Sequence, residues 1–201
     1  MKKVIVTAII TVLWTMLIVL LIAAGVARMG MINVAATAEY LPGAEWFFST
    51  LSEQSIQRQA REAVEEGRIT PPQEITASML DNGRHHFEEM CVVCHGAPGV
   101  DRGEIGKGQK PIPPDLSEVA REMSIAEIYW VVEHGIRHTG MPAYGETHSA
   151  NELWGIAAFV EQLENMSPEK YQRLTSKEAA PVGVADESPE LGGHDHSTHT
   201  H

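Results

Sequence analysis

Cysteine and basic residues are both scarce in this chain of 201 residues, and each shortage excludes a class of function. Only two cysteines occur, Cys91 and Cys94, so a zinc site built from two cysteine pairs is not available. Lysine and arginine number 15 against 27 acidic residues, a formal net charge of −12. Because the phosphates of nucleic acid would repel such a chain, we expect no nucleic-acid partner.

Both cysteines lie in one short motif, Cys91-Val92-Val93-Cys94-His95. The pattern C-x-x-C-H is the attachment signature of c-type haem. Cys91 and His95 are one helical turn apart, so a single turn presents two thiols and an imidazole to one planar group. A thioredoxin-like pair would lie beside a βαβ pattern, which is absent, and a simple disulfide would leave His95 unexplained. The motif therefore predicts one covalently attached haem c.

Residues 4–27 contain no charged side chain. At about 1.5 Å per residue they form a helix of about 36 Å, which is long enough to span a bilayer core of about 30 Å. Lys2 and Lys3 precede this run and Arg28 follows it. We therefore predict an N-terminal transmembrane anchor over residues 1–28, with the N-terminus in the cytoplasm. The rest of the chain would then lie in the bacterial periplasm, where haem is attached, as a single-pass protein of the inner membrane.

A cleaved signal peptide is the alternative for this segment, because Ala36-Thr37-Ala38 has the small-x-small pattern of a cleavage site. The apolar run exceeds the usual 7–15 residues of a signal sequence, however, and the small residues lie well beyond its end. Length favours the uncleaved anchor.

Residues 29–73 form a predicted linker that contains an amphipathic helix at about 45–66. Its apolar residues have spacings of four, five, four and four, which roughly keeps one helical face: Phe47, Leu51, Ile56, Ala60 and Val64. One interpretation is a helix packed on its own domain or lying at the membrane interface; the other is a docking helix for a membrane partner. The glycine at 67 and the prolines at 71 and 72 end this helix.

Residues 74–166 are predicted to form the globular domain, with helices over 75–95, 124–135 and from Ser149 or Asn151 to about Leu163. Ser124 and Glu127 form a predicted capping box. The loop over 96–114 is rich in glycine and proline. Within it, the Pro114 carbonyl is a candidate acceptor for the Nδ1–H of His95.

The second axial ligand of the haem iron must come from a separate segment. Met141 lies in a Gly-Met-Pro turn between two helices, where glycine permits close approach and proline stiffens the chain. A His/Met pair is a known ligand set, so we predict Met141 as the distal ligand. His134, His138 and His148 are weaker candidates because none has a rigid loop of its own. Met123 and Met166 are interpreted as packing or surface residues.

Residues 167–201 lose apolar periodicity and are predicted to be a disordered tail. The tail carries two H-x-H pairs, formed by His194, His196, His199 and His201. These histidines are possible ligands for copper, zinc or nickel, and a flexible tail without physiological metal is the alternative.

Four segments occur in order, CVVCH, PPDL, TGMPAYG and ELWGIAAFVEQL, and with them the chain resembles a class I mono-haem c-type cytochrome. The resemblance covers residues 75–165, and is to bacterial members carried on an N-terminal anchor. It implies an all-α cytochrome c fold around one haem, with Cys91 and Cys94 as thioethers, His95 as proximal and Met141 as distal ligand. It further implies a crossing of the first and last helices at these positions: Gly83, Phe87, Trp154 and Phe159.

We therefore expect single-electron transfer between respiratory partners, by a tethered carrier or by a haem subunit of a larger complex, without a small-molecule substrate or enzymatic chemistry of its own. Residues 79–163 contain 13 acidic and 6 basic side chains, so a redox partner with a basic docking surface is expected. The alternatives are a haem sensor or peroxidase, which needs an open iron site, and metal handling by the tail.

Overall fold

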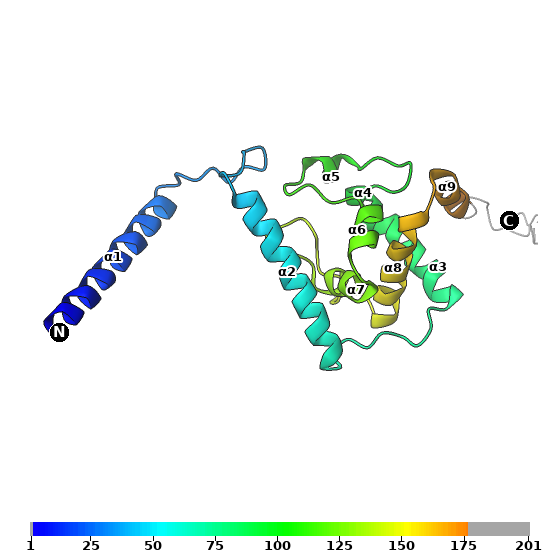
Figure 1. Ribbon diagram of the computed structural model, residues 1–201. Coiled ribbons are helices and arrows are strands. Elements are labelled where there is room, and N and C mark those ends of the chain that lie inside the picture. Colours follow the sequence, from blue (N-terminus) through cyan, green and yellow to red (C-terminus); the bar gives the residue numbers. More distant parts are fainter. Residues whose placement is uncertain (1, 177–201) are drawn as a thin grey trace, which may run out of the picture.

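The computed structural model describes residues 2–176, and within them the chain is helical and forms no β-strand. This confirms the all-α prediction. Figure 1 shows one helix standing apart and the others gathered into a globular part. The helices are α1 (Lys2–Arg28), α2 (Ala44–Glu65), α3 (Ala77–His86), α4 (Val92–His95), α5 (Glu104–Gly108), α6 (Leu116–Glu122), α7 (Ile125–His134), α8 (Ala150–Gln162) and α9 (Pro168–Ser176).

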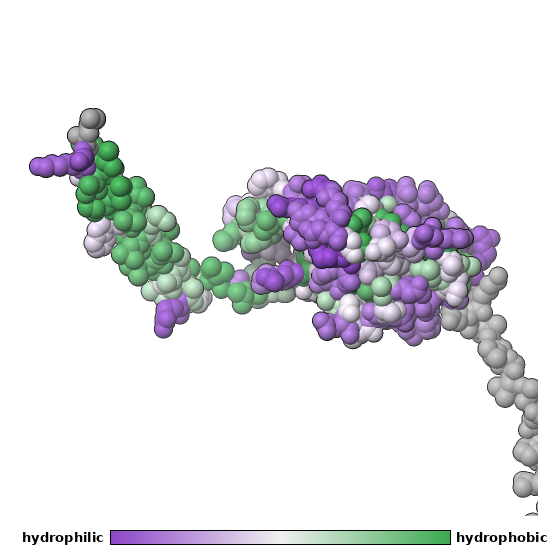
Figure 2. All heavy atoms as spheres, turned by 90° about the horizontal axis from the view of Figure 1, so that it is seen from below, coloured by the Kyte–Doolittle hydropathy of each residue, from purple (hydrophilic) through white to green (hydrophobic). Residues whose placement is uncertain are grey.

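Helix α1 buries none of its residues against the rest of the protein. It is long and apolar enough to cross a membrane. Figure 2 shows hydrophobic side chains along α1 bounded by hydrophilic residues, whereas the globular part has a mainly hydrophilic surface. The predicted single N-terminal apolar helix is confirmed, and it is a candidate membrane anchor.

Helix α8 is the centre of the globular core. Ser149 and Glu152 form a capping box at its start, because each side chain accepts a hydrogen bond from the other residue's backbone N–H. Every residue from 153 to 160 is buried. The helix packs on α3, α6 and α7, so three elements cover it.

The crossing of α3 and α8 depends on two glycines. A Cβ atom added to Gly83 would lie 2.0 Å from the carbonyl oxygen of Gly155, so the two backbones touch. Beside this point the rings of Phe87 and Phe159 lie 5.2 Å apart. The close helix crossing predicted at Gly83 is therefore present, and its partner is a glycine that the sequence pattern did not single out.

Helix α7 begins at the predicted capping box of Ser124 and Glu127 and ends at Gly135, which has a φ of 64°. Tyr129 on this helix stacks on Trp154 of α8 with ring centroids 4.2 Å apart. Stacking of two buried aromatic rings adds to the area they remove from water. It fixes α7 against α8.

Two predictions about the globular part need correction. The helix predicted over 75–95 is not continuous: a π-helical turn, Phe87–Cys91, separates α3 from α4. The chain is also not disordered from residue 167 on, since residues 168–176 form α9. The reason is Tyr171, which is buried and packs against Phe87 with ring centroids 6.4 Å apart. One apolar anchor holds a segment whose composition is otherwise polar.

Helix α2 differs from prediction in which side chains it buries. Ile56, Ala60 and Ala63 are buried, and α2 packs on α7. Phe47 and Leu51 are exposed, so the single apolar face expected over the whole helix is wrong. The step of five residues between Leu51 and Ile56 is the cause, because at about 100° per residue it rotates the side chain by about 140°.

Candidate functional site

The two cysteines occupy the junction between the π-helical turn and α4. Cys91 is the last residue of the turn. Cys94 lies in α4, two residues before the C-cap Gly96, which has a φ of 71°. Both thiols are free, which removes the disulfide alternative in this structure. Burial raises the pKa of the Cys91 thiol to about 12, so that this thiol is protonated at neutral pH.

The glycine-rich loop after the motif packs directly on the motif's backbone. A Cβ atom on Gly106 would lie 2.2 Å from the carbonyl oxygen of Cys94, and one on Gly103 would lie 2.8 Å from that of Val93. No larger residue fits at either position without moving the chain. The loop therefore holds the motif in place, a role that the sequence pattern did not reveal.

His95 is oriented through its ring nitrogen. Its Nδ1 lies 2.9 Å from the carbonyl oxygen of Pro114. Because a carbonyl can only accept, Nδ1 carries the hydrogen, and the lone pair of the neutral ring is on Nε2. Burial lowers the pKa of His95, and the hydrogen bond to Pro114 partly opposes that shift. The hydrogen bond expected from the sequence is present, and it leaves the imidazole in the form that binds iron.

The loop that carries Met141 is anchored on both sides. The backbone N–H of Met141 donates to Oγ1 of Thr139 at 3.1 Å, and its carbonyl accepts from the N–H of Ile136 at 3.2 Å. The side chain is half-buried and packs against the core that contains Cys91. Met141 is therefore held by local hydrogen bonds and by the same core as the motif.

Gln109 connects this loop to the cysteine motif. Its Nε2 lies 3.5 Å from the sulfur of Cys94. A Cβ atom on Gly140 would lie 2.4 Å from the Gln109 side chain, so the residue before Met141 touches it. The structure thus brings the turn before Met141 to within one side chain of Cys94. Gln109 was missed because a glutamine in a glycine-rich loop carries no recognisable signal.

Two further residues line this region. The half-buried side chain of Tyr144 packs against the core that contains Cys91, and burial raises the pKa of Tyr144 to about 12. Arg102 lies near His95 and has a buried Nε without a hydrogen-bond partner in the part of the chain that the structure describes. Buried donors normally have partners, and a haem carboxylate is an anion of the required kind. These observations fit a bound haem.

The alternative histidine ligands make other contacts. His134 Nδ1 lies 3.0 Å from the carbonyl oxygen of Trp130, and the two rings stack. His148 packs edge-on against His86 with ring centroids 4.9 Å apart. His138 is exposed. Met141 remains the predicted distal ligand.

Of the two roles left open for Met123 and Met166, packing or surface, the structure shows packing: Met166 is buried, and Met123 is half-buried against the core. Among residues 2–176 no group of three histidine, cysteine or acidic side chains could hold a metal ion. The predicted tail ligands His194, His196, His199 and His201 lie outside the described residues.

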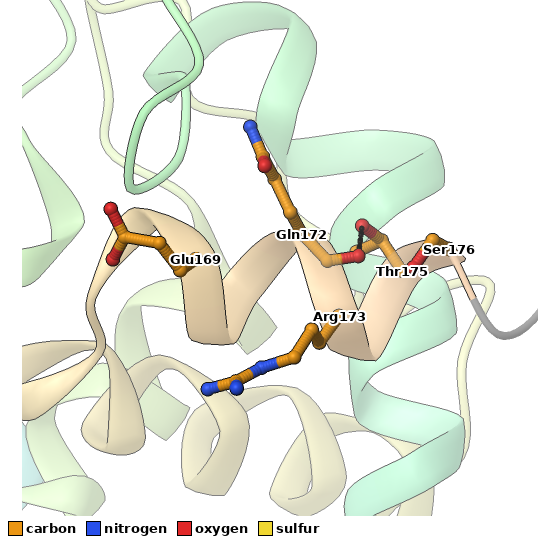
Figure 3. A pocket seen from close by; sticks show the side chains of 5 residues that line it. All are labelled: Glu169, Gln172, Arg173, Thr175 and Ser176. Atoms are coloured by element: carbon orange, nitrogen blue, oxygen red, sulfur yellow. Dashed lines mark hydrogen bonds between the residues drawn. The ribbon is translucent and has the colours of Figure 1, made fainter.

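A depression on the surface lies elsewhere, along α9. Figure 3 shows that Glu169, Gln172, Arg173, Thr175 and Ser176 line it. All five belong to one helix, and none is a predicted haem residue. It has no part in the site described above.

An all-α core around a C-x-x-C-H motif, with an oriented histidine and a methionine loop anchored beside it, defines a mono-haem c-type cytochrome domain. Residues 78–160 match the family model described as cytochrome c oxidase, cbb3-type, subunit III. No curated protein matches the chain. The match identifies these residues as a c-type cytochrome domain, which binds haem c covalently, exchanges electrons with redox proteins and belongs to a class of electron carriers rather than enzymes.

Proposed function

We propose that this chain is a membrane-tethered mono-haem cytochrome c in which Cys91 and Cys94 form the thioethers, and His95 and Met141 are the axial ligands. The observation that carries this proposal is the 2.9 Å contact between His95 Nδ1 and the carbonyl oxygen of Pro114. A histidine fixed in this tautomer by a backbone carbonyl is the arrangement expected of a metal ligand.

The protein's own residues keep the ligands in place. Pro114 holds the ring of His95, and the hydrogen bonds of Thr139 and Ile136 hold the turn of Met141. When bound, haem c supplies a one-electron couple between Fe(III) and Fe(II). If His95 and Met141 both bind the iron, no position would be left for a small-molecule substrate, and the function would be electron transfer alone.

The proposed location is the bacterial inner membrane, with α1 as a retained single-pass anchor. Lys2 and Lys3 are the first two residues of α1 and Arg28 is its last, which favours a cytoplasmic N-terminus and a periplasmic haem domain. In this division residues 1–28 are the anchor, 29–73 the connection and 74–166 the cytochrome domain.

The proposed partner presents a basic docking surface to the acidic haem domain, whose residues 79–163 carry 13 acidic and 6 basic side chains. The chain acts either as a tethered carrier or as a haem subunit of a larger complex. The description of the matched family, an oxidase subunit, supports the second form for the matched residues, which are less than half of the chain.

Absorption spectra of the oxidised and reduced full-length protein test the ligand set. We expect a low-spin c-type spectrum with the weak red sulfur-to-iron band, and loss of that band in Met141→Ala. The matched control is Met123→Ala, which removes a half-buried methionine from the core and should keep the band. A high-spin wild type, or a Met141→Ala spectrum identical to wild type, would contradict the proposal.

A further inference from the structure

The first half of α2 exposes four large apolar side chains that the haem domain does not use. Trp46, Phe47, Phe48 and Leu51 are 71 %, 54 %, 59 % and 54 % exposed. We call these four residues the aromatic end of α2. Single exposed apolar residues are ordinary on protein surfaces, but a contiguous group of this kind marks an interaction site.

The fold of the domain does not account for the aromatic end. The other half of α2 packs on α7 through Ile56, Ala60 and Ala63. At about 100° per residue, Phe47 and Leu51 lie on nearly the opposite side of the helix from those three. The domain therefore contacts only one face of the second half of α2. The aromatic end of α2 is free to contact something outside the domain.

The position of the aromatic end in the chain identifies its surroundings. Fifteen residues, 29–43, connect α1 to α2 and reach at most about 50 Å when fully extended. Several of them are apolar and exposed, namely Met29, Met31, Ile32, Val34, Tyr40 and Leu41. Figure 2 shows hydrophobic side chains along α1 and along the connection to the globular part. The apolar surface of the anchor therefore continues to α2.

The charges of this region argue against an electrostatic contact. No lysine or arginine occurs between Arg28 and Arg58, while Glu39, Glu45 and Glu53 are acidic. Anionic lipid headgroups attract basic side chains, so they would not hold this segment. Tryptophan and other aromatic rings settle at the boundary between lipid and water through their apolar bodies alone. The chemistry fits the bilayer interface.

We propose that the aromatic end of α2 lies in the membrane interface beside the exit of α1, on the same side of the membrane as the haem domain. Since the other half of α2 is packed on α7, the helix then connects the cytochrome domain rigidly to the membrane and fixes its position. A domain so held does not move freely on a flexible tether. This inference rests on the proposed role of α1 as an anchor.

Spin labels on the full-length haem protein in phosphatidylcholine bilayers test the inference. The haem thioethers occupy both native cysteines, so an introduced cysteine is the only reactive thiol. One label replaces Leu51 at the aromatic end, as Leu51→Cys. The matched control is Arg58→Cys, on the same face two turns (about 10 Å) further along. Arg58 is exposed, with a side chain 69 % accessible. A third label, Val19→Cys, reports on α1.

We expect the Leu51 label to have a several-fold higher ratio of collisions with oxygen to collisions with a water-soluble nickel chelate than the Arg58 label. The ratio should not change with salt or with added anionic lipid. Replacing Trp46, Phe47 and Phe48 together by serine should lower the Leu51 ratio to that of Arg58 while leaving the haem spectrum unchanged.

Equal ratios at Leu51 and Arg58 would overturn the inference. So would a Leu51 label shielded from both reagents, because that result indicates contact with a protein, either a second copy or another membrane protein. If the Val19 label is in lipid in these cases, only the proposed contact of α2 with the membrane interface is contradicted, and the proposed anchor stands. A Val19 label in water would instead contradict the proposed anchor.

Discussion

Helices α8 and α2 differ in how many of their apolar residues and caps make contacts within the protein. In α8 every residue from 153 to 160 is buried, and the helix begins at a complete capping box. In α2 only Ile56, Ala60 and Ala63 are buried, and its N-cap, Gly43, makes no side-chain hydrogen bond. The core and the cap account for α8. The first half of α2 has neither a buried residue nor a side-chain cap among the described residues.

The difference follows the limits of the cytochrome domain. The family match over residues 78–160 includes α8 except for its last two residues, and it excludes α2. The elements within the match bury their apolar residues around the haem motif, while the first half of α2 leaves its large apolar side chains exposed.

Two phenylalanine substitutions separate these regions most clearly. Phe87 is completely buried, so Phe87→Ala should lower the free energy of unfolding by about 3–5 kcal/mol. Phe47 is more than half exposed, so Phe47→Ala should change it by no more than about 0.5 kcal/mol in detergent solution. Denaturant titrations followed by circular dichroism measure both values. Comparable losses for the two variants would show that the first half of α2 belongs to the core after all.

The glycine crossing gives the next largest effect. Gly83→Ala should destabilise the protein by about 2–3 kcal/mol, because the new methyl group would overlap the Gly155 backbone. Gly108→Ala is the control, since nothing lies within 4 Å of a Cβ atom there. Thermal unfolding of the two variants provides the comparison. A Gly83→Ala protein as stable as Gly108→Ala would mean that the helices can separate at little cost.

The cap of α8 gives the smallest effect, and it depends on pH. Hydrogen bonds from the backbone N–H and hydroxyl of Ser149 lower the pKa of Glu152 below its usual 4.5. Because the pKa of this carboxyl is lower in the folded state, the carboxylate stabilises the fold at pH values above the unfolded-state pKa. This stabilisation is lost as the pH falls through the folded-state pKa. Glu152→Gln should therefore reduce stability at neutral pH and leave it closer to wild type at pH 3. Unfolding measured at both pH values checks this; a constant difference would contradict the assigned cause.

Features set by local sequence were the most predictable. The capping box of Ser124 and Glu127 occurs where the pattern places it, because the residue types and the spacing of three define the cap. For the last helix the sequence offered Ser149 or Asn151 as the cap, and the structure has Ser149, in a capping box with Glu152. The hydrogen bond from His95 to Pro114 joins residues 19 apart, so local spacing does not set it; it was expected from the PPDL segment and from the family resemblance. The roles of His95 and Met141 as iron ligands stay predictions.

Features that depend on packing between distant segments were not predictable. The rotation within α2 is an exception, because the step of five residues between Leu51 and Ile56 is visible in the sequence and by itself moves the apolar stripe to another face. Helix α9 was missed because one buried residue, Tyr171, orders a polar segment. Gly155 and Gln109 have roles defined only by what lies across from them, and neither residue type carries a signal by itself.

The central claim is that two protein ligands hold the haem iron for electron transfer alone. A spectroelectrochemical titration of the full-length protein in bilayers, repeated under carbon monoxide, tests it most directly. The account predicts one reversible one-electron transition, a low-spin spectrum in both oxidation states and no change with carbon monoxide. A reduced protein that becomes high-spin or binds carbon monoxide at neutral pH would contradict it and would favour a sensor or an enzyme.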